Sequence, residues 1–185
     1  NRYLPNHILY FFEKEEILKN YENKNNILSV LIYKEDNTYK IVNFLKESSL
    51  DSPYHTKKHL ELIKNTFNEI LNLNSSNKEE VIRDLLIIYQ QNFIRNTSVF
   101  LLNKVYDFKT AYDTYNISVD TITSILHKYK RLTSDSDIIS KINFLLNIEQ
   151  SNSKYILASM NMINNDYDSA VKNLIACMQL LPYYP

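Results

Sequence analysis

Histidine and cysteine are the residue types in this chain that could bind a metal ion or act as a nucleophile. His55 and His59 lie four residues apart, a spacing at which two imidazoles on one helix can share a metal. A complete site needs further ligands, whereas the two lysines between these histidines would place positive charge beside the cation. We therefore interpret both as exposed helical residues. His7 and His127 have no catalytic partner in the sequence.

The single cysteine, Cys177, lies within a C-terminal segment of helical periodicity. A reactive thiol needs an activating histidine or a helix N-terminus beside it, so we predict a small packing residue instead. The carboxylate pairs fall at expected helix starts or on exposed faces, where the helix dipole and solvent account for them. These pairs are Glu15 with Glu16, Glu79 with Glu80, and Asp166 with Asp168. We predict no catalytic residues and no metal site.

Glycine is absent from the 185 residues. Glycine allows a positive φ and a close approach of the backbone to a phosphate, so its absence excludes Walker loops, dinucleotide-binding loops and nucleophile elbows. Lysine plus arginine (21) equal aspartate plus glutamate (21), which leaves no general field to attract nucleic acid. We expect a protein that is not an enzyme, needs no cofactor and binds no nucleic acid.

Hydropathy predicts a soluble domain. No apolar run approaches the roughly 20 residues that cross a bilayer; the best candidates are residues 85–89 and 99–102. The first residue is Asn1, so a removed leader or anchor stays open. With one cysteine, no disulfide framework indicates a compartment, and both a cytoplasmic and an exported location remain open.

The first fifty residues predict a small α/β element. Residues 6–21 carry apolar side chains at helical spacing, and Asn6 is placed to cap that helix. Residues 27–34 and 39–45 are β-branched and aromatic runs around a polar turn, which indicates a two-stranded hairpin. An isolated hairpin is marginal in water, so it must pack on helices or pair with another chain, which leaves a homo-oligomer through its edge open.

Residues 51–185 predict a helical body, preceded by a linker in the Ser/Asp/Pro-rich stretch 46–54. A helix is expected at about 55–73, and the next one begins at a capping box formed by Ser76 and Glu79. Further helices are expected at about 98–116, 119–131, 135–149, 153–164 and 167–181. The expected caps of the later helices are Ser118, Ser134 and Ser153 or Asp166. The fold class is therefore mainly α, with a body of helical hairpins.

Residues 154–182 contain leucines, alanines and a proline at the spacing of a known helical repeat. Leu157 and Ala158 are followed by Ala170, Leu174 and Pro182 at the intervals of the pattern W-x2-L-G-x2-Y, A-x3-F and P. This segment resembles a tetratricopeptide unit, whose period is about 34 residues. The resemblance implies an antiparallel helical hairpin over 153–182, with small residues where the two helices cross.

Several positions depart from that pattern or adapt it. Lys154 replaces the tryptophan and Asn161 the tyrosine, while Asn164 and Asn165 replace the turn glycine with residues that tolerate left-handed backbone. A fainter copy of the pattern occurs at residues 108–115, and its distance along the chain from the unit at 154–182 is not a multiple of 34 residues. We expect an irregular array of hairpins.

The resemblance implies a protein-protein interaction module or scaffold. In the tetratricopeptide family the first helix of each unit makes the contacts, at positions that map here to Asn152, Tyr155, Ser159 and Met162. These residues share one helical face, with Tyr155 as anchor and Asn152 and Ser159 as hydrogen-bonding groups. A second set would be Asn96, Phe100 and Asn103. The alternative is that they form a solvated stripe.

A second function class stays open for the N-terminal element. It could form a small α/β ligand-binding or hydrolytic domain that the helices support. Its signature would be a pocket lined by aromatic residues: Tyr10, Phe11, Phe12, Tyr33 and Phe44.

Overall fold

The computed structural model describes residues 8–10, 28–35, 38–45, 54–85, 87–88, 91 and 108–181. The side chains of the first three segments and of residues 54–58, 60, 108 and 111 are not among those described. The chain divides into two compact units, residues 1–82 and 83–185. Among the helices described, none combines the length and the apolar character needed to span a membrane.

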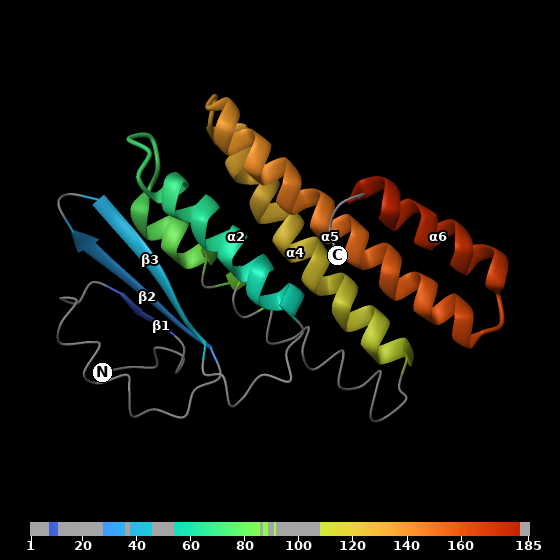
Figure 1. Cartoon of the computed structure of the whole chain (residues 1–185). Helices are drawn as coiled ribbons and strands as arrows, with labels where there is room; N and C mark the ends of the chain where they lie inside the picture. Colours follow the sequence, from blue (N-terminus) through green and yellow to red (C-terminus); the bar gives the residue numbers. More distant parts are fainter. Residues whose placement is uncertain are drawn as a thin grey trace. The chain divides into compact units, whose positions relative to one another are not determined.

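The first unit contains a three-stranded sheet in the order β1-β2-β3 (Figure 1). Strand β1 is Ile8–Tyr10, β2 is Leu28–Glu35 and β3 is Thr38–Leu45. β2 and β3 pair antiparallel from Leu28 opposite Leu45 to Glu35 opposite Thr38. β1 pairs parallel with β2, with Ile8 opposite Val30.

Strand β1 corrects the helix predicted for residues 6–21. Residues 8–10 are extended because they pair with β2, some twenty residues further along the chain, and such pairing overrides the local helical periodicity. The sheet thus has three strands where the sequence predicts a hairpin of two. The remaining residues of the predicted helix lie outside the described residues.

Helix α2, Tyr54–Leu71, packs against β3. Its apolar stripe is buried as the periodicity predicts, at Ile63, Phe67 and Ile70. The end of the helix is closed by Lys78, whose ammonium group donates to the carbonyl oxygens of Leu71 and Leu73, the latter at 2.7 Å. The last carbonyls of a helix, such as that of Leu71, lack partners within the helix, so this lysine stabilises the end of α2.

The next helical residues, 78–85, begin one position later than the predicted capping box. Asn77 is the capping residue, because its Oδ1 accepts a hydrogen bond from Glu80 N at 3.2 Å. Ser76 instead donates to the carbonyl of Leu73 at 2.8 Å. The capping box predicted from Ser76 and Glu79 is therefore wrong.

The second unit contains three long helices: α4 (Phe108–Leu132), α5 (Ser136–Ile163) and α6 (Tyr167–Leu180). α5 lies between the other two and packs against both (Figure 1). Short turns at 133–135 and 164–166 make consecutive helices antiparallel. The described residues confirm a mainly α protein with packed helical hairpins.

Two predicted breaks do not exist. α4 runs through Ser118 and α5 runs through Ser153, although both serines were expected to cap new helices. Ser118 is fully buried and its hydroxyl donates to the carbonyl of Gln91 at 3.5 Å. Ser153 donates to Oδ1 of Asn116 at 2.9 Å and so joins α5 to α4. A serine whose hydroxyl bonds a neighbouring helix does not compete for its own backbone.

The cap of α5 is Asp135, one residue after the predicted Ser134. Its carboxylate accepts from the backbone N–H groups of Asp137 and Ile138 at 2.9 and 3.2 Å. Asp166 caps α6, as one of the two alternatives predicted, and accepts from Ser169 N at 3.2 Å. Each carboxylate also complements the positive end of its helix dipole.

Packing in the second unit includes polar contacts as well as apolar ones. Tyr115 and Val119 of α4 cluster with Ile156 of α5. Asp84 accepts hydrogen bonds from Lys128 Nζ at 2.8 Å and from Tyr129 Oη at 2.6 Å, both on α4. These hydrogen bonds attach the helical residues around Asp84 to α4.

The linker predicted at 46–54 lies outside the described residues except for Tyr54. The predicted boundary between residues 1–50 and 51–185 therefore stays a prediction. The compact units themselves divide between Ile82 and Arg83.

Candidate functional site

A tight turn sets the geometry of the hairpin formed by α5 and α6. Asn165 has a φ of 60°, in the left-handed region. Its N–H donates to the carbonyl of Met162 at 3.1 Å, and Asp166 N donates to Asn161 O at 2.8 Å. This pair of bonds is the Schellman motif that ends many helices, usually at a glycine. The predicted use of asparagine in place of glycine is confirmed at Asn165.

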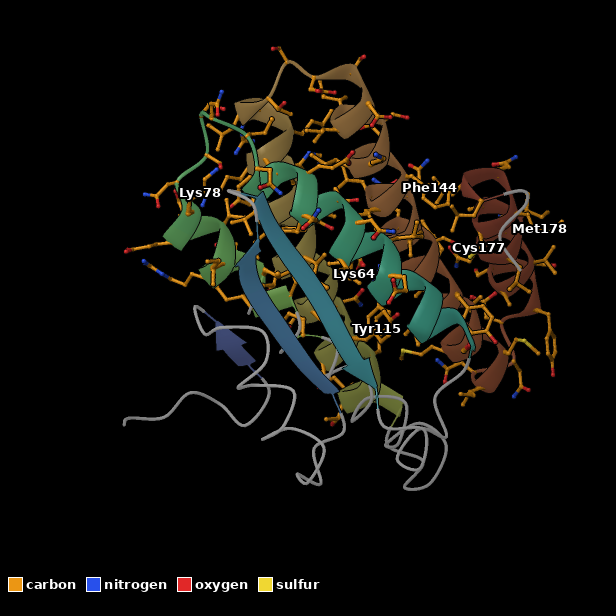
Figure 2. The ribbon with its side chains drawn as sticks, turned by 60° about the vertical axis from the view of Figure 1, so that its left-hand side comes forward. Lys64, Lys78, Tyr115, Phe144, Cys177 and Met178 are labelled. Carbon is orange, nitrogen blue, oxygen red and sulfur yellow. The ribbon has the colours of Figure 1, made fainter. Side chains whose placement is uncertain are left out.

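Two side-chain hydrogen bonds define which sides of the helices face each other. Asn173 Nδ2 donates to Asn161 Oδ1 at 3.0 Å, and the thiol of Cys177 donates to the carbonyl of Ser151 at 3.2 Å. Figure 2 shows Cys177 on the α5 side of α6. The predicted packing role of Cys177 agrees with this contact.

The two alanines that the tetratricopeptide pattern places at the crossing are buried. Ala158 is 1% and Ala170 is 2% exposed. Small side chains allow the backbones of two helices to approach closely. The first helix differs from a tetratricopeptide unit, however, because residues 153–163 are the last part of a helix that begins at Ser136. Pro182 lies outside the described residues.

The four predicted contact residues lie along one side of α5. Tyr155 and Met162 are 59% and 53% exposed, while Asn152 and Ser159 are partly buried. The hydroxyl of Ser159 donates to the carbonyl of Tyr155 at 3.0 Å, so its proton is used within the helix and only its oxygen can accept from a partner. The structure thus places the four residues on one side of α5, with the Ser159 hydroxyl bonded within the helix.

A second exposed stripe lies on α6, and the sequence analysis did not predict it as a surface. Its members are Tyr167, Val171, Ile175 and Met178, all about half exposed or more. Their spacing of four, four and three residues places them on one face of a helix. Met178 and Cys177 point away from α6 in different directions (Figure 2). The spacing was visible in the sequence, but apolar residues at this period predict a buried face equally well.

Charged residues mark the two ends of this surface. Asp166 and Asp168 lie at the turn, and hydrogen bonds from Ser169 hold the pKa of the Asp166 carboxyl below its usual value. At the other end, burial raises the pKa of the Cys177 thiol, and the positive charge of Lys154 acts in the opposite direction. Lys154 lies about one helical turn after Ser151, whose carbonyl contacts Cys177, so the apolar stripes run from an acidic to a basic end.

The described residues hold no group of three or more potential metal ligands. His59 is buried on α2, so its predicted exposure is wrong; the helix turns that side toward the core. His127 is exposed on α4. The second predicted contact set, Asn96, Phe100 and Asn103, and the side chains of the predicted aromatic pocket lie outside the described residues.

We find no match to this chain among protein-family models, curated proteins or solved structures.

Proposed function

We propose that this chain is a non-catalytic protein-protein interaction module or scaffold, and that the α5–α6 hairpin presents the face that binds a partner protein or peptide. The observation that carries the proposal is the exposure of Tyr155 and Met162 on one side of α5, beside the apolar stripe of α6. Contiguous exposed apolar side chains on a folded protein are typical of binding surfaces.

The residue types favour a protein partner. Tyrosine supplies a large contact area with few rotatable bonds to order, and methionine adapts its shape to different neighbours. Burying such apolar surface contributes roughly 25 cal/mol per Å². Tyr155, Met162 and the four residues of the α6 stripe are themselves uncharged, and the exposed Asp168 and Lys172 border the stripe.

The finer resemblance to a tetratricopeptide unit is part of the same proposal. The buried alanines, the tight turn at Asn165 and the cap at Asp166 are compatible with it. In such units the first helix makes the contacts, which favours Tyr155 as the anchor with Asn152, Ser159 and Met162 around it.

The test is a cross-linking and affinity experiment on the full chain. A photoreactive phenylalanine analogue replaces Tyr155, the cross-linked protein is identified, and its affinity is measured for the native chain and for Tyr155→Ala. We expect the substitution to cost at least about 2 kcal/mol of binding free energy, as buried anchors do. Ile117→Ala is the matched control, because Ile117 is an equally exposed apolar residue on α4.

The opposite result would place the contact elsewhere. If Tyr155→Ala binds its partner normally while Val30→Asp in β2, folded by circular dichroism, loses binding, the first unit carries the surface. Because β2 is the central strand, addition of a partner strand at the edge strands β1 or β3 would be the mechanism to test next.

A further inference from the structure

The exposed stripes of α5 and α6 open toward the same side of the hairpin. On each helix the side that faces its neighbour is fixed by the contacts of Ser151 and Asn161 with Cys177 and Asn173. At about 3.6 residues per turn, the exposed stripe lies about a quarter turn from that side on α5 and more than a third of a turn from it on α6, in the same rotational sense. Because the helices are antiparallel, the two rotations lead toward one common side of the hairpin. We call it the hairpin face.

The hairpin face consists of six large exposed side chains, which are Tyr155, Met162, Tyr167, Val171, Ile175 and Met178. Each helix in the second unit buries apolar residues against its neighbour, and α5 does so on both sides. α6 presents an apolar stripe to solvent as well. A further layer of helix is the occupant that fits such a stripe.

The order of residues along α6 is complementary to its own reverse. Tyr167 and Met178 lie at opposite ends of the stripe, with Val171 and Ile175 between them. When two such helices pack antiparallel about a two-fold axis between residues 172 and 173, each Tyr167 meets a Met178 and each Val171 meets an Ile175. A thioether against an aromatic ring is a favourable contact, and two-fold dimers are the commonest oligomers.

The charges reverse in the same way. Asp168 lies at the turn end of the hairpin face, and Lys154 lies near Cys177 at the other end. The same two-fold axis brings the acidic end of each hairpin to the basic end of the other, which gives two equivalent contacts. Lys172 is exposed near the axis, at the outer border of the stripe, and its charge interacts with Asp166 of its own chain.

We propose that the occupant of the hairpin face is a second copy of this chain, which packs its α5–α6 hairpin on the first to form an antiparallel four-helix arrangement. This inference rests on the proposed function, because it names the partner of the same face. Tyr155 and Met162 contribute to the contact from α5, and the pairs formed by Asp168 with the second copy's Lys154 fix its direction.

The first experiment measures the oligomeric state of the full chain by sedimentation equilibrium over a range of concentrations. We expect a monomer-dimer equilibrium. Val171→Asp is expected to give a monomer with an unchanged circular dichroism spectrum, because Val171 is exposed in the single chain. Ile117→Asp, an exposed position on α4, is expected to leave the dimer intact.

The second experiment exchanges charges between copies. Lys154→Glu alone and Asp168→Lys alone each set like charges opposite one another, and each is expected to weaken the dimer by about tenfold or more. A mixture of the two variants restores both opposite-charge pairs, so their heterodimer should form with nearly native affinity. Lys109→Glu, exposed on the first turn of α4, is the charge control.

The outcomes separate this inference from the proposed function. A chain that stays monomeric at every concentration overturns the second copy as occupant, whereas a cross-link from position 155 to a different protein would keep the interaction module. A dimer that is insensitive to Val171→Asp and to both charge reversals forms through another surface, and this also overturns the inference. The inference is supported if the dimer is recovered in the mixture of the two charge variants and stays intact in both control variants.

Discussion

Asn161 of α5 and Asn173 of α6 join their side-chain amides across the hairpin, with 3.0 Å between Oδ1 of Asn161 and Nδ2 of Asn173. Asn161 stands where the tetratricopeptide pattern has an aromatic residue. An aromatic side chain there would fill space toward a neighbouring unit, whereas the amide is directed to α6. A buried or half-buried amide pair fixes the register of two helices, because a shift would leave both groups without partners. The amide pair therefore favours one defined register of α5 on α6.

Substitution of Asn165 tests the glycine-free turn. Left-handed backbone costs a residue with a Cβ atom about 1–2 kcal/mol, less for asparagine and least for glycine. We expect Asn165→Ala to lower the free energy of unfolding by about 1 kcal/mol. Asn165→Gly should lie close to the native chain, because it relieves the backbone but loses the hydrogen bond from Tyr167 Oη at 3.0 Å. Urea unfolding of the three proteins measures the order, and an alanine variant as stable as the native chain would contradict it.

Ala170→Leu tests the close packing of α5 and α6. Because Ala170 is almost fully buried, the added carbons have no free volume and must displace one helix. We expect a loss of about 1–3 kcal/mol in the free energy of unfolding, measured by urea titration. Val171→Leu adds a methylene group one residue along, on the exposed side, and should change stability by less than about 0.5 kcal/mol. Equal effects of the two substitutions would mean that the crossing is loose.

Local signals predicted some of these features well. The mainly helical class, the bounds of α2 and α6, the left-handed Asn165 and the cap Asp166 follow from helical periodicity and from the conformational preferences of single residues. Each of these depends on neighbours within one or two turns. A sequence read in short windows contains that information.

Features that depend on distant residues could not be predicted in this way. Ser118 and Ser153 have the side chains of helix caps, but their hydroxyls bond partners 27 and 37 residues away, so the helices continue. β1 is a strand because of its pairing with β2. The exposure of the α6 stripe depends on which helix side α5 covers. Only the tertiary arrangement decides these three cases.

The contact of Asp84 with α4 gives a prediction about stability. Its carboxylate accepts from both Lys128 and Tyr129, and Asp84 is largely shielded from water. We expect Asp84→Asn to cost about 1–3 kcal/mol in the free energy of unfolding, because a charge-assisted bond is weakened and a lysine loses its partner carboxylate. Thermal and urea unfolding at low and high salt would measure this loss.

A double-mutant cycle isolates the pair. Asp84→Asn combined with Tyr129→Phe should be less destabilising than the sum of the single variants, with a coupling energy of about 0.5–3 kcal/mol. The exposed pair of Lys141 and Asp137, at 2.8 Å, is the matched comparison. Lys141→Gln should cost only about 0.2–0.5 kcal/mol. Strictly additive losses for Asp84 and Tyr129 would show that their bond does not stabilise the fold.

The thiol of Cys177 gives a prediction about reactivity. Burial raises its pKa, and the charge of Lys154 opposes that effect without cancelling it. Since the thiolate is the reactive form, we expect iodoacetamide to label the folded chain more slowly than the urea-unfolded chain at the same pH. The rate in the folded chain should rise only at a pH above the ordinary range of a cysteine, as followed by mass spectrometry.

Lys154 and pH provide two further checks on the same thiol. Lys154→Ala removes the opposing charge, so the pKa of Cys177 should rise further and labelling should slow again, whereas Lys172→Ala should have little effect. The folded chain keeps a proton that the unfolded chain releases, so this group contributes stability below the ordinary pKa and loses it as the pH rises toward the raised value. Cys177→Ser, which does not ionise in that range, should flatten this part of the stability curve. Labelling of the folded chain at the unfolded rate would show that the thiol is not held in the contact with Ser151.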